Sequence, residues 1–283
     1  MWRERKFMSL TAICNDIRLL AIDCDNRSLD YRCPGCGAKM ILVKGVQKCD
    51  HFRHEKNSDC KWGTGETCFH LEAKQWLYEK LTNHPSVEQV ELECTRFEGI
   101  RPDIAFKCTQ RPWIGIEFQH SNISDLEIMH RCRKYSENGV YVLWVVTQDV
   151  LEKVFGCELR NNKLNKEKRI PKYVRSFRIL HNFVFGFTGS EIVACQYEPV
   201  FRFDDYSGSW NELKTILECK DFRVVHIEDL RRKRMVTEHG TLHDYHKPCL
   251  TIDDPIKEKD NFKFSSKQRW IPVEWIGGNH VQM

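Results

Sequence analysis

The sequence predicts a mixed α/β fold of the α+β type, with an αβββαβ core between a small N-terminal β module and a mixed α/β C-terminal region. Three observations lead to this prediction. Cys and His residues cluster near the N-terminus, a helical spacing of apolar residues begins at Thr64, and an uninterrupted apolar run spans 140–146. We expect the β module at 1–63, the core at 64–150 and the C-terminal extension at 151–283.

The N-terminal module begins with two short strands, SLTAIC and IRLLAID, around the polar turn Asn15-Asp16. The motif CPGCG follows at 33–37, and a hairpin that turns at Lys44-Gly45 ends in the motif HFRH. Short apolar runs separated by turn residues are typical of antiparallel strands. We therefore expect a small sheet that carries its Cys and His residues in turns and at strand ends.

Cys33 and Cys36 stand at the spacing that lets two thiolates reach one tetrahedral metal ion. The second pair of ligands has two interpretations, because His51, His54 and Cys60 lie close together. The gap between the two histidines is short for a zinc site, whereas His54 and Cys60 leave a usual one. We favour Cys33, Cys36, His54 and Cys60 as ligands of a structural Zn²⁺, with His51 as the competing ligand. Free thiols beside surface histidines are the alternative.

The core begins with a helix from Thr64 to about Asn83. Its apolar residues recur three and four positions apart, and they are Phe69, Ala73, Trp76, Leu77 and Leu81. Pro85 follows soon after, as expected beyond a helix end. Three strands come next, in VEQVELECT, RPDIAF and WIGIEFQ, which are rich in β-branched and aromatic residues.

A second helix is expected from about Ser124 to Asn138. Ser124 and Glu127 form a capping box at its start, and Gly139 supplies its C-terminal stop. The run VYVLWVV then has the composition of a fully buried strand. Three strands, a crossover helix and a buried strand make a mixed sheet with helices on its faces.

The C-terminal extension has weaker patterns. Residues 175–203 suggest two or three strands, and 211–220 suggest a short helix. Basic residues concentrate in 158–180, with eight Lys or Arg against two Glu, and in the RRKR cluster at 231–234. Such runs are ordinarily solvated faces, and otherwise they contact a phosphate backbone.

Composition bounds the function. Hydrophobic residues make up 41% of the 283 residues, which excludes wholesale disorder, and a net charge of +4 is too small to indicate a polyanion partner by itself. No apolar segment with a cleavage site follows the basic start, and no apolar run reaches about 18 residues. We expect a cytoplasmic protein whose 14 cysteines favour metal binding over disulfides.

Asp103 and Glu117 lie in two neighbouring apolar strands, where a carboxylate is costly unless something pairs with it. If the hairpin turns at Cys108–Pro112, antiparallel pairing puts Asp103 opposite Glu117 or Phe118. Glu117 and Gln119 share one face of their strand. We therefore expect Asp103, Glu117 and Gln119 to converge at one end of the sheet, where they would offer a seat for Mg²⁺ or Mn²⁺.

The two helices add polar groups. Glu66, His70 and Lys74 are four residues apart and line one stripe beside the apolar face of the first helix. There Glu66 can reach the metal ion or orient a water, and His70 and Lys74 can hold a phosphate or stabilise developing charge. Arg131 and Tyr135 are four residues apart on the second helix, so both can bind one phosphate of a nucleic-acid backbone. As an alternative, each helix pair is an ordinary surface pair, and Glu66 merely favours the helix dipole.

Seven motifs occur in a fixed order: CPGCG, HFRH, Asp59-Cys60, GETCFHLEAK, RPDIAF, IGIEFQHS and RCRKY. In order and spacing they resemble the CoiA-like competence protein family, over about residues 8–150 and more loosely to about 200. The resemblance implies a zinc-binding module followed by a restriction-endonuclease-like PD-(D/E)XK nuclease domain. It also implies metal-dependent action on DNA in recombination, competence or mobile-element contexts.

Carried over by match, Asp103 is the acid of the PD motif, Glu117 that of the second motif and Glu66 the first-helix acid. His70 and Lys74 belong to the helix pattern. We therefore expect Mg²⁺ or Mn²⁺ at Glu66, Asp103 and Glu117, and hydrolysis of phosphodiester bonds.

One position departs from the general nuclease pattern, because Gln119 stands where the signature has a lysine. We expect Lys74 or Arg101 to supply the missing cation, and Arg101, Arg131 and Tyr135 to contact DNA. Two rival functions remain. One is a module that binds branched or single-stranded DNA for a partner without cutting, which Gln119 favours, and the other is a zinc-dependent adaptor with structural carboxylates. A homodimer or a recombination protein is the expected protein partner, and no membrane is expected.

Overall fold

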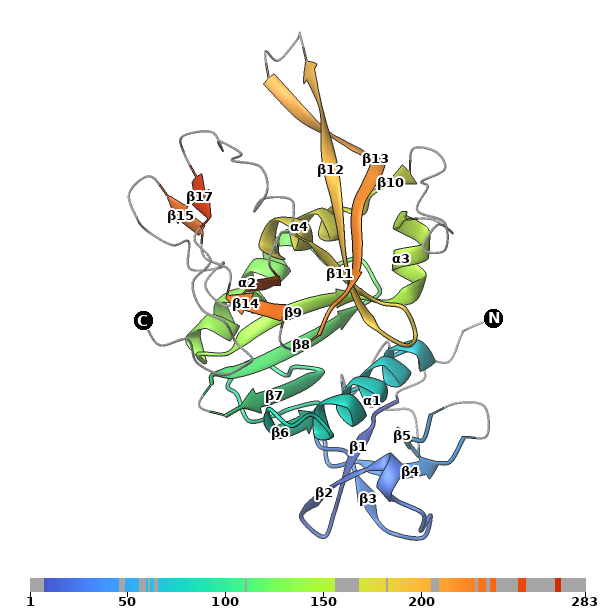
Figure 1. Ribbon diagram of the computed structural model, residues 1–283. Coiled ribbons are helices and arrows are strands. Elements are labelled where there is room, and N and C mark those ends of the chain that lie inside the picture. The colour runs from blue at the N-terminus through green and yellow to red at the C-terminus, as the bar shows by residue number, and fades with distance from the viewer. Residues whose placement is uncertain are drawn as a thin grey trace, which may run out of the picture.

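The structure is a computed structural model of the chain. It describes residues 8–45, 49–55, 60, 62–63, 66–109, 111–155, 168–181, 183–204, 209–226, 229–232, 235–237, 249–252 and 268–270. Two sheets dominate it, and both expected parts, the small β module and the α/β core, are present (Figure 1). The α+β fold class is confirmed.

The N-terminal module is a five-stranded antiparallel sheet in the order β2-β1-β3-β4-β5. Its elements are β1 (Thr11–Cys14), β2 (Ile17–Leu20), the 3-10 helix η1 (Ala21–Asp23), β3 (Tyr31–Arg32), β4 (Lys39–Val43) and β5 (His51–His54). Asn15 and Asp16 both have positive φ, as the tight turn between β1 and β2 requires. Tyr31, Phe52 and Trp62 fill the module's core.

The second sheet has eight strands in the order β10-β13-β12-β11-β9-β8-β7-β6. In the predicted core it contains β6 (Val87–Leu92), β7 (Ile104–Cys108), β8 (Trp113–Gln119) and β9 (Tyr141–Val146). β6, β7 and β8 form an antiparallel meander, and β9 joins β8 in parallel after a crossover helix. The order of elements predicted from residues 64 to 146 is therefore confirmed.

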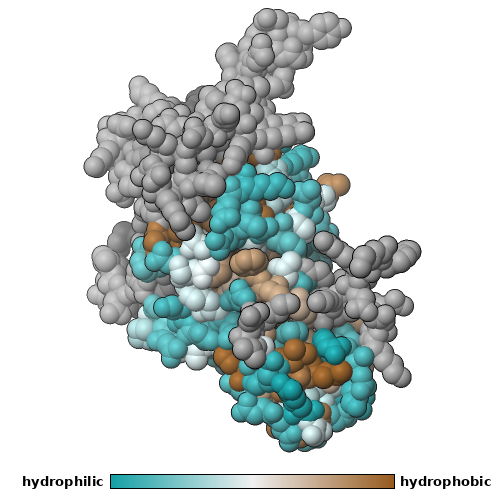
Figure 2. All heavy atoms as spheres, turned by 90° about the vertical axis from the view of Figure 1, so that its right-hand side faces the viewer, coloured by the Kyte–Doolittle hydropathy of each residue, from teal (hydrophilic) through white to brown (hydrophobic). Residues whose placement is uncertain are grey.

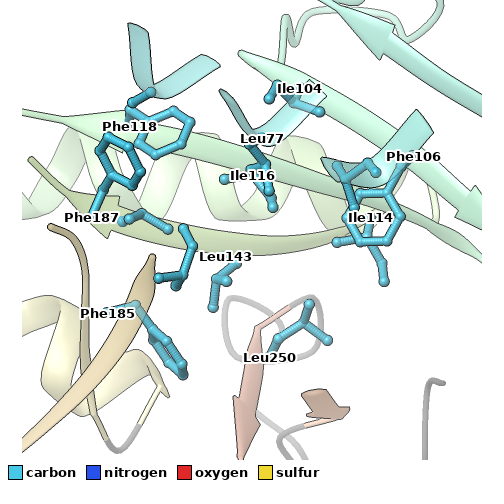
Figure 3. Packing of buried hydrophobic residues seen from close by; sticks show 14 of the residues in the cluster. Leu77, Ile104, Phe106, Ile114, Ile116, Phe118, Leu143, Phe185, Phe187 and Leu250 are labelled. Atoms are coloured by element: carbon cyan, nitrogen blue, oxygen red, sulfur yellow. The ribbon is translucent and has the colours of Figure 1, made fainter. Parts of the chain in front are cut away.

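Helices cover both faces of this sheet (Figure 1). α1 (Cys68–Thr82) packs on one face, while α2 (Asp125–Glu137), α3 (Gln148–Phe155) and α4 (Lys172–His181) pack on the other. Alternate residues of β8 divide between the two faces, so Ile114, Ile116 and Phe118 join the α1 layer. Figure 3 shows side chains of α1, β7, β8, β9 and β11 meeting in that layer.

The ends of α2 match their prediction closely. The hydroxyl oxygen of Ser124 accepts a hydrogen bond from the backbone N–H of Glu127, and Gly139 follows the helix with a φ of +65°. The first helix starts later than expected. Its N-cap is Thr67, so Glu66 precedes the helix instead of lying within it.

Two of the strands expected in 175–203 are present, at 184–187 and 192–204, but the start of that range and the helix expected at 211–220 were wrong. Residues 172–181 form a helix, α4, because Tyr173, Val174, Phe177 and Leu180 recur at helical spacing and bury one face. Residues 211–220 lie in the long strand β13 (Ser209–Val224), because pairing with β12 (Ile192–Asp204) overrides their helical propensity.

The remaining strands extend or flank this core. β11 (Val184–Phe187) pairs with β9 in parallel, so the sheet continues past residue 150. The short strands are β10 (Lys168–Arg169), β14 (Leu230–Arg232), β15 (Met235–Thr237), β16 (Leu250–Ile252) and β17 (Gln268–Trp270). Residues 158–167 of the basic segment and 233–234 of the RRKR cluster lie outside the described residues. Within the described ranges, each helix is too short or too polar to cross a lipid bilayer.

On the face shown in Figure 2, the coloured surface is mostly hydrophilic. In the view of Figure 2, apolar surface gathers at the lower end, where the N-terminal module lies. The large apolar side chains that this module exposes are Ile17, Ile22 and Leu29.

Candidate functional site

Four side chains converge at one end of the N-terminal module. One ligand atom from each of Cys33, Cys36, His54 and Cys60 lies within 4.8 Å of the others. The sulfur atoms of Cys33 and Cys60 are 3.8 Å apart, and Nε2 of His54 lies 3.4 Å from the sulfur of Cys36. Two thiolates from a knuckle, a third thiolate and an imidazole form a donor set suited to a closed tetrahedral zinc site.

The local backbone explains how the knuckle forms. Gly37 adopts a φ of +70°, and its N–H donates to the carbonyl of Cys33 at 2.9 Å, which closes the turn. The backbone N–H groups of Gly35 and Trp62 point at the sulfur atoms of Cys33 and Cys60. His51 lies elsewhere, with Nδ1 3.1 Å from the carbonyl oxygen of Cys49. The cluster therefore contains the four residues that spacing favoured, without the competing ligand.

A second cluster lies between α1 and the meander. Ligand atoms of Glu66, His70 and Asp103 all lie within 4.8 Å of one another. Nε2 of His70 is 3.0 Å from Oδ2 of Asp103, and Nδ1 of His70 is 3.6 Å from Oε2 of Glu66. Glu66 immediately precedes the N-cap of α1, and His70 lies in the first turn of the helix. The segment before α1 therefore supplies the carboxylate, and the helix supplies the imidazole.

Lys74 is completely buried beneath this cluster. Its Nζ atom lies 3.0 Å from Glu66, 3.1 Å from Glu93 and 3.7 Å from Asp103. Burial favours the neutral amine, but the three carboxylates outweigh burial and the pKa of Lys74 is raised. The pKa of His70 is raised in the same way. Burial lowers this pKa, but the nearby carboxylates of Asp103 and Glu66 raise it by more. The ammonium of Lys74 therefore lies between the two carboxylates of the cluster and the carboxylate of Glu93, with the imidazole of His70 beside them.

Asp103 occupies a bend just before β7. Its Oδ2 atom accepts a hydrogen bond of 2.8 Å from the backbone N–H of Phe118, at the point where the β7–β8 ladder opens. The β7–β8 pairing ends at Ile104 with Ile116, so Asp103 lies one residue beyond the ladder, and its direct opposition to Glu117 or Phe118 stays a prediction. Burial would raise the pKa of Asp103, but His70, Lys74 and this hydrogen bond lower it.

Glu117 is buried but has different partners. Its Oε1 atom accepts a hydrogen bond of 2.5 Å from the Tyr135 hydroxyl and forms an ion pair with Arg131, both on α2. Burial raises the pKa of Glu117; Arg131 opposes this shift, and the charge of Asp103 adds to it. Asp103 thus contacts the helix on one face of the sheet and Glu117 the helix on the other. The sharing of one cation by Glu66, Asp103 and Glu117 stays a prediction.

The other predicted residues have partners of their own. The side-chain amide of Gln119 donates to the carbonyl oxygen of Ser121 at 2.7 Å. The guanidinium of Arg101 lies 4.1 Å from the ring centroid of Trp62, at the seam between the module and the core. Arg131 and Tyr135, expected on DNA, both contact Glu117.

Sequence reasoning missed Glu93. This residue follows β6, is buried, and accepts hydrogen bonds from Ser9, Thr11 and Lys74. One signal was available, because Glu93 interrupts the apolar end of VEQVELECT between Leu92 and Cys94. The pattern of apolar and polar residues in this segment, however, does not reveal that Glu93 faces Lys74 of α1.

Two buried polar atoms in the acidic cluster are consistent with a metal ion at this position. Oε2 of Glu66 and Nδ1 of His70 are buried and make no hydrogen bond to any residue that the structure describes. An unsatisfied buried carboxylate oxygen is costly unless a cation or water completes it. Carboxylate ligands suit Mg²⁺ and Mn²⁺, and an imidazole is compatible with a transition-metal ion.

Two family models match separate parts of the chain. The family model described as the competence protein CoiA N-terminal domain matches residues 21–63, and the model described as its nuclease-like domain matches 66–172. Together they cover more than half of the chain. The competence protein CoiA of Bacillus subtilis (strain 168) is 26% identical over 117 residues, which are 41% of this chain and 31% of that protein. No solved structure matches the chain.

Proposed function

Because the chain belongs to the CoiA-like competence protein family, we propose that it is a metal-dependent nuclease that hydrolyses phosphodiester bonds in DNA. The observation that carries the proposal is the buried cluster of Glu66, His70 and Asp103, in which one carboxylate oxygen makes no hydrogen bond to a described residue. Mg²⁺ or Mn²⁺ is the proposed catalytic ion, and Zn²⁺ is the proposed structural ion at the cysteine-rich cluster. The match spans only 31% of the length of the Bacillus subtilis protein.

Glu66, His70 and Asp103 would hold the catalytic ion. A bound divalent cation supplies charge neutralisation at a phosphate and a water of lowered pKa. Asp103 is fixed by the backbone N–H of Phe118, so its carboxylate needs little reorganisation when it binds. Lys74 lies against Glu66 and Asp103 and is the proposed replacement for the lysine that Gln119 does not provide.

Glu117 is the proposed third carboxylate. Arg131, which pairs with it, keeps 28% of its side chain exposed. A backbone phosphate can therefore compete with Glu117 for the guanidinium, because both are anions with oxygen acceptors that a guanidinium binds. DNA binding would in this way free Glu117 from its cation, and Tyr135 would be left as its remaining partner.

The N-terminal module would position the nucleic acid. Arg101 is stacked on Trp62 at its seam, and the basic segment 160–178 supplies further positive charge. Contacts of this type bind phosphates without reading sequence, so we expect salt-sensitive and weakly sequence-specific binding. A reducing cytoplasm is the proposed compartment, and a second copy of the chain or a recombination protein is the proposed protein partner.

Cleavage by purified protein tests the proposal directly. Single-stranded, duplex and branched DNA, with RNA for comparison, are incubated with Mg²⁺ or Mn²⁺ and either wild-type protein or Asp103→Ala. We expect the wild type to cut DNA and Asp103→Ala to lose at least about 100-fold in rate while it still binds DNA. Equal cutting by both proteins would overturn the assignment.

A module that binds branched or single-stranded DNA without cutting it is the second candidate. Two observations favour it: Gln119 donates to its own loop at Ser121, and Glu117 is engaged by Arg131. This function predicts that wild type and Asp103→Ala bind branched DNA equally and that neither cuts any substrate with either ion.

A further inference from the structure

Glu93 has an unusual place in the chain. It follows the last residue of β6 with a φ of +48°, a left-handed backbone that a glutamate rarely adopts. Its backbone N–H donates to the carbonyl of Asp103 at 2.8 Å, and its side chain is almost completely buried. A strained, buried acid beside a cluster of acids indicates a role beyond packing.

Lys74 creates a difficulty for metal binding. Its ammonium lies 3.0 Å from Glu66 and 3.7 Å from Asp103, the two carboxylates proposed as ligands. An ammonium and a divalent cation compete for the same oxygens, and a buried ammonium without a carboxylate is costly. A lysine that serves this site therefore needs an anion of its own.

The inference rests on the proposed function. We propose that Glu93 is a positioning residue, which gives Lys74 a dedicated counter-charge so that Glu66 and Asp103 can accept a metal ion without displacing the lysine. Glu93 lies 3.1 Å from Lys74 and is not among the three residues whose ligand atoms form the acidic cluster. It can therefore keep the ammonium in place whether or not the cluster is filled.

The N-terminal module fixes Glu93 in turn. Ser9 and Thr11 each donate a hydroxyl hydrogen bond of 2.6 Å to Oε2 of Glu93, so Oε1 is left to face Lys74. Ser9 also accepts a hydrogen bond of 3.1 Å from the indole N–H of Trp62, whose backbone N–H points at the sulfur of Cys60. A continuous chain of contacts thus links the cysteine-rich cluster to Lys74.

Mn²⁺ titration of the zinc-loaded full-length protein tests the inference. Affinity is measured by calorimetry for wild type, Glu93→Gln, Lys74→Met and the double variant. Among the residues that the structure describes, Lys74 without Glu93 has only Glu66 and Asp103 as ionic partners, so we expect Glu93→Gln to weaken Mn²⁺ binding about tenfold. With Lys74 removed there is no competitor, so the same change should cost less than about twofold.

The cycle separates positioning from a general charge effect. If Glu93 acts only through its negative charge, Glu93→Gln will weaken Mn²⁺ equally in both backgrounds, and the inference is overturned. Glu93→Asp, which keeps the charge, should recover part of the affinity. Glu91→Gln, two residues earlier in β6 and paired with Arg96 instead, is the matched control and should leave Mn²⁺ affinity within about twofold.

Folding of the variants and Mn²⁺ binding by the wild type complete the test. Thermal unfolding of each variant verifies that it is folded, and Lys74→Gln replaces Lys74→Met if the latter does not fold. Wild-type protein that binds no Mn²⁺ would overturn the proposed function and this inference together. Normal wild-type binding with additive variants would overturn the inference alone.

Discussion

The hydroxyl of Tyr135 donates a hydrogen bond of 2.5 Å to Oε1 of Glu117, and the path between them is open because residue 115 is a glycine. A Cβ atom at position 115 would lie 2.6 Å from Cε1 of Tyr135 and 3.2 Å from Cγ of Pro102. The close approach of α2 to β8 therefore depends on a missing side chain.

Gly115→Ala should destabilise the protein by about 1–3 kcal/mol, because the added methyl group overpacks against the Tyr135 ring. Urea unfolding followed by fluorescence measures the change. In a Tyr135→Leu background, which removes the clashing ring atom, the same substitution should cost less than half as much. An equal cost in both backgrounds would place the clash elsewhere.

Arg131→Met should lower the free energy of unfolding by about 2 kcal/mol. The substitution leaves Glu117 buried without its cation, and the partial exposure of Arg131 reduces the penalty below that of a fully buried pair. Arg133→Met, an exposed cation on the same helix, is the control and should change stability by less than about 0.5 kcal/mol. Adding Glu117→Gln to Arg131→Met should restore most of the loss, and a failure to do so would contradict the pairing.

His54→Ala should abolish stoichiometric zinc binding, whereas His51→Ala should retain about one zinc ion per chain. The reason is geometric, because His54 belongs to the cluster with Cys36 and His51 faces Cys49. Metal content after dialysis and a colorimetric zinc assay measure the difference. Loss of zinc in His51→Ala with retention in His54→Ala would reverse the ligand assignment.

Glu93 should make the protein sensitive to acid. Burial raises its pKa, but Lys74, Ser9 and Thr11 outweigh burial and lower the pKa to about 2. A carboxyl group with a depressed pKa stabilises the folded state above its ordinary pKa, and that stability is lost as the pH falls toward the folded value. From a shift between 4.5 and about 2, the contribution at neutral pH is about 3 kcal/mol.

Urea unfolding of wild type and Glu93→Gln between pH 7 and pH 2 measures this contribution. The variant should be less stable at pH 7, and the gap should close between about pH 4.5 and pH 2. Glu88→Gln, an exposed position in the preceding strand β6, should keep the wild-type profile. A constant gap at all pH values would show that Glu93 stabilises the fold through shape instead of charge.

Local spacing was enough to anticipate several features of the structure. The CPGC knuckle with His54 and Cys60, the capping box at Ser124 and the hairpin of β7 and β8 all follow from short-range rules about turns, caps and strand pairing. These rules act between residues close in sequence or joined by one hairpin, so the sequence carries them without the rest of the fold.

Other features depend on segments far apart in the chain. Residues 211–220 have helical propensity, yet they form a strand because β12 offers a long pairing edge. Residues 172–181 form a helix because their apolar side chains meet the sheet at helical spacing. The local sequence does not show how strongly the pairing with β12 or the packing on the sheet stabilises these segments.

The sequence by itself determined which groups are chemically able to hold metal ions, because ligand type and spacing are local properties. Only the tertiary structure decided how the buried charges are shared. It turned Asp103 toward α1 and Glu117 toward α2, and it brought Glu93, which follows β6, to Lys74. The physical reason is that a buried charge takes the partner that packing places within reach, and that partner can come from any part of the chain.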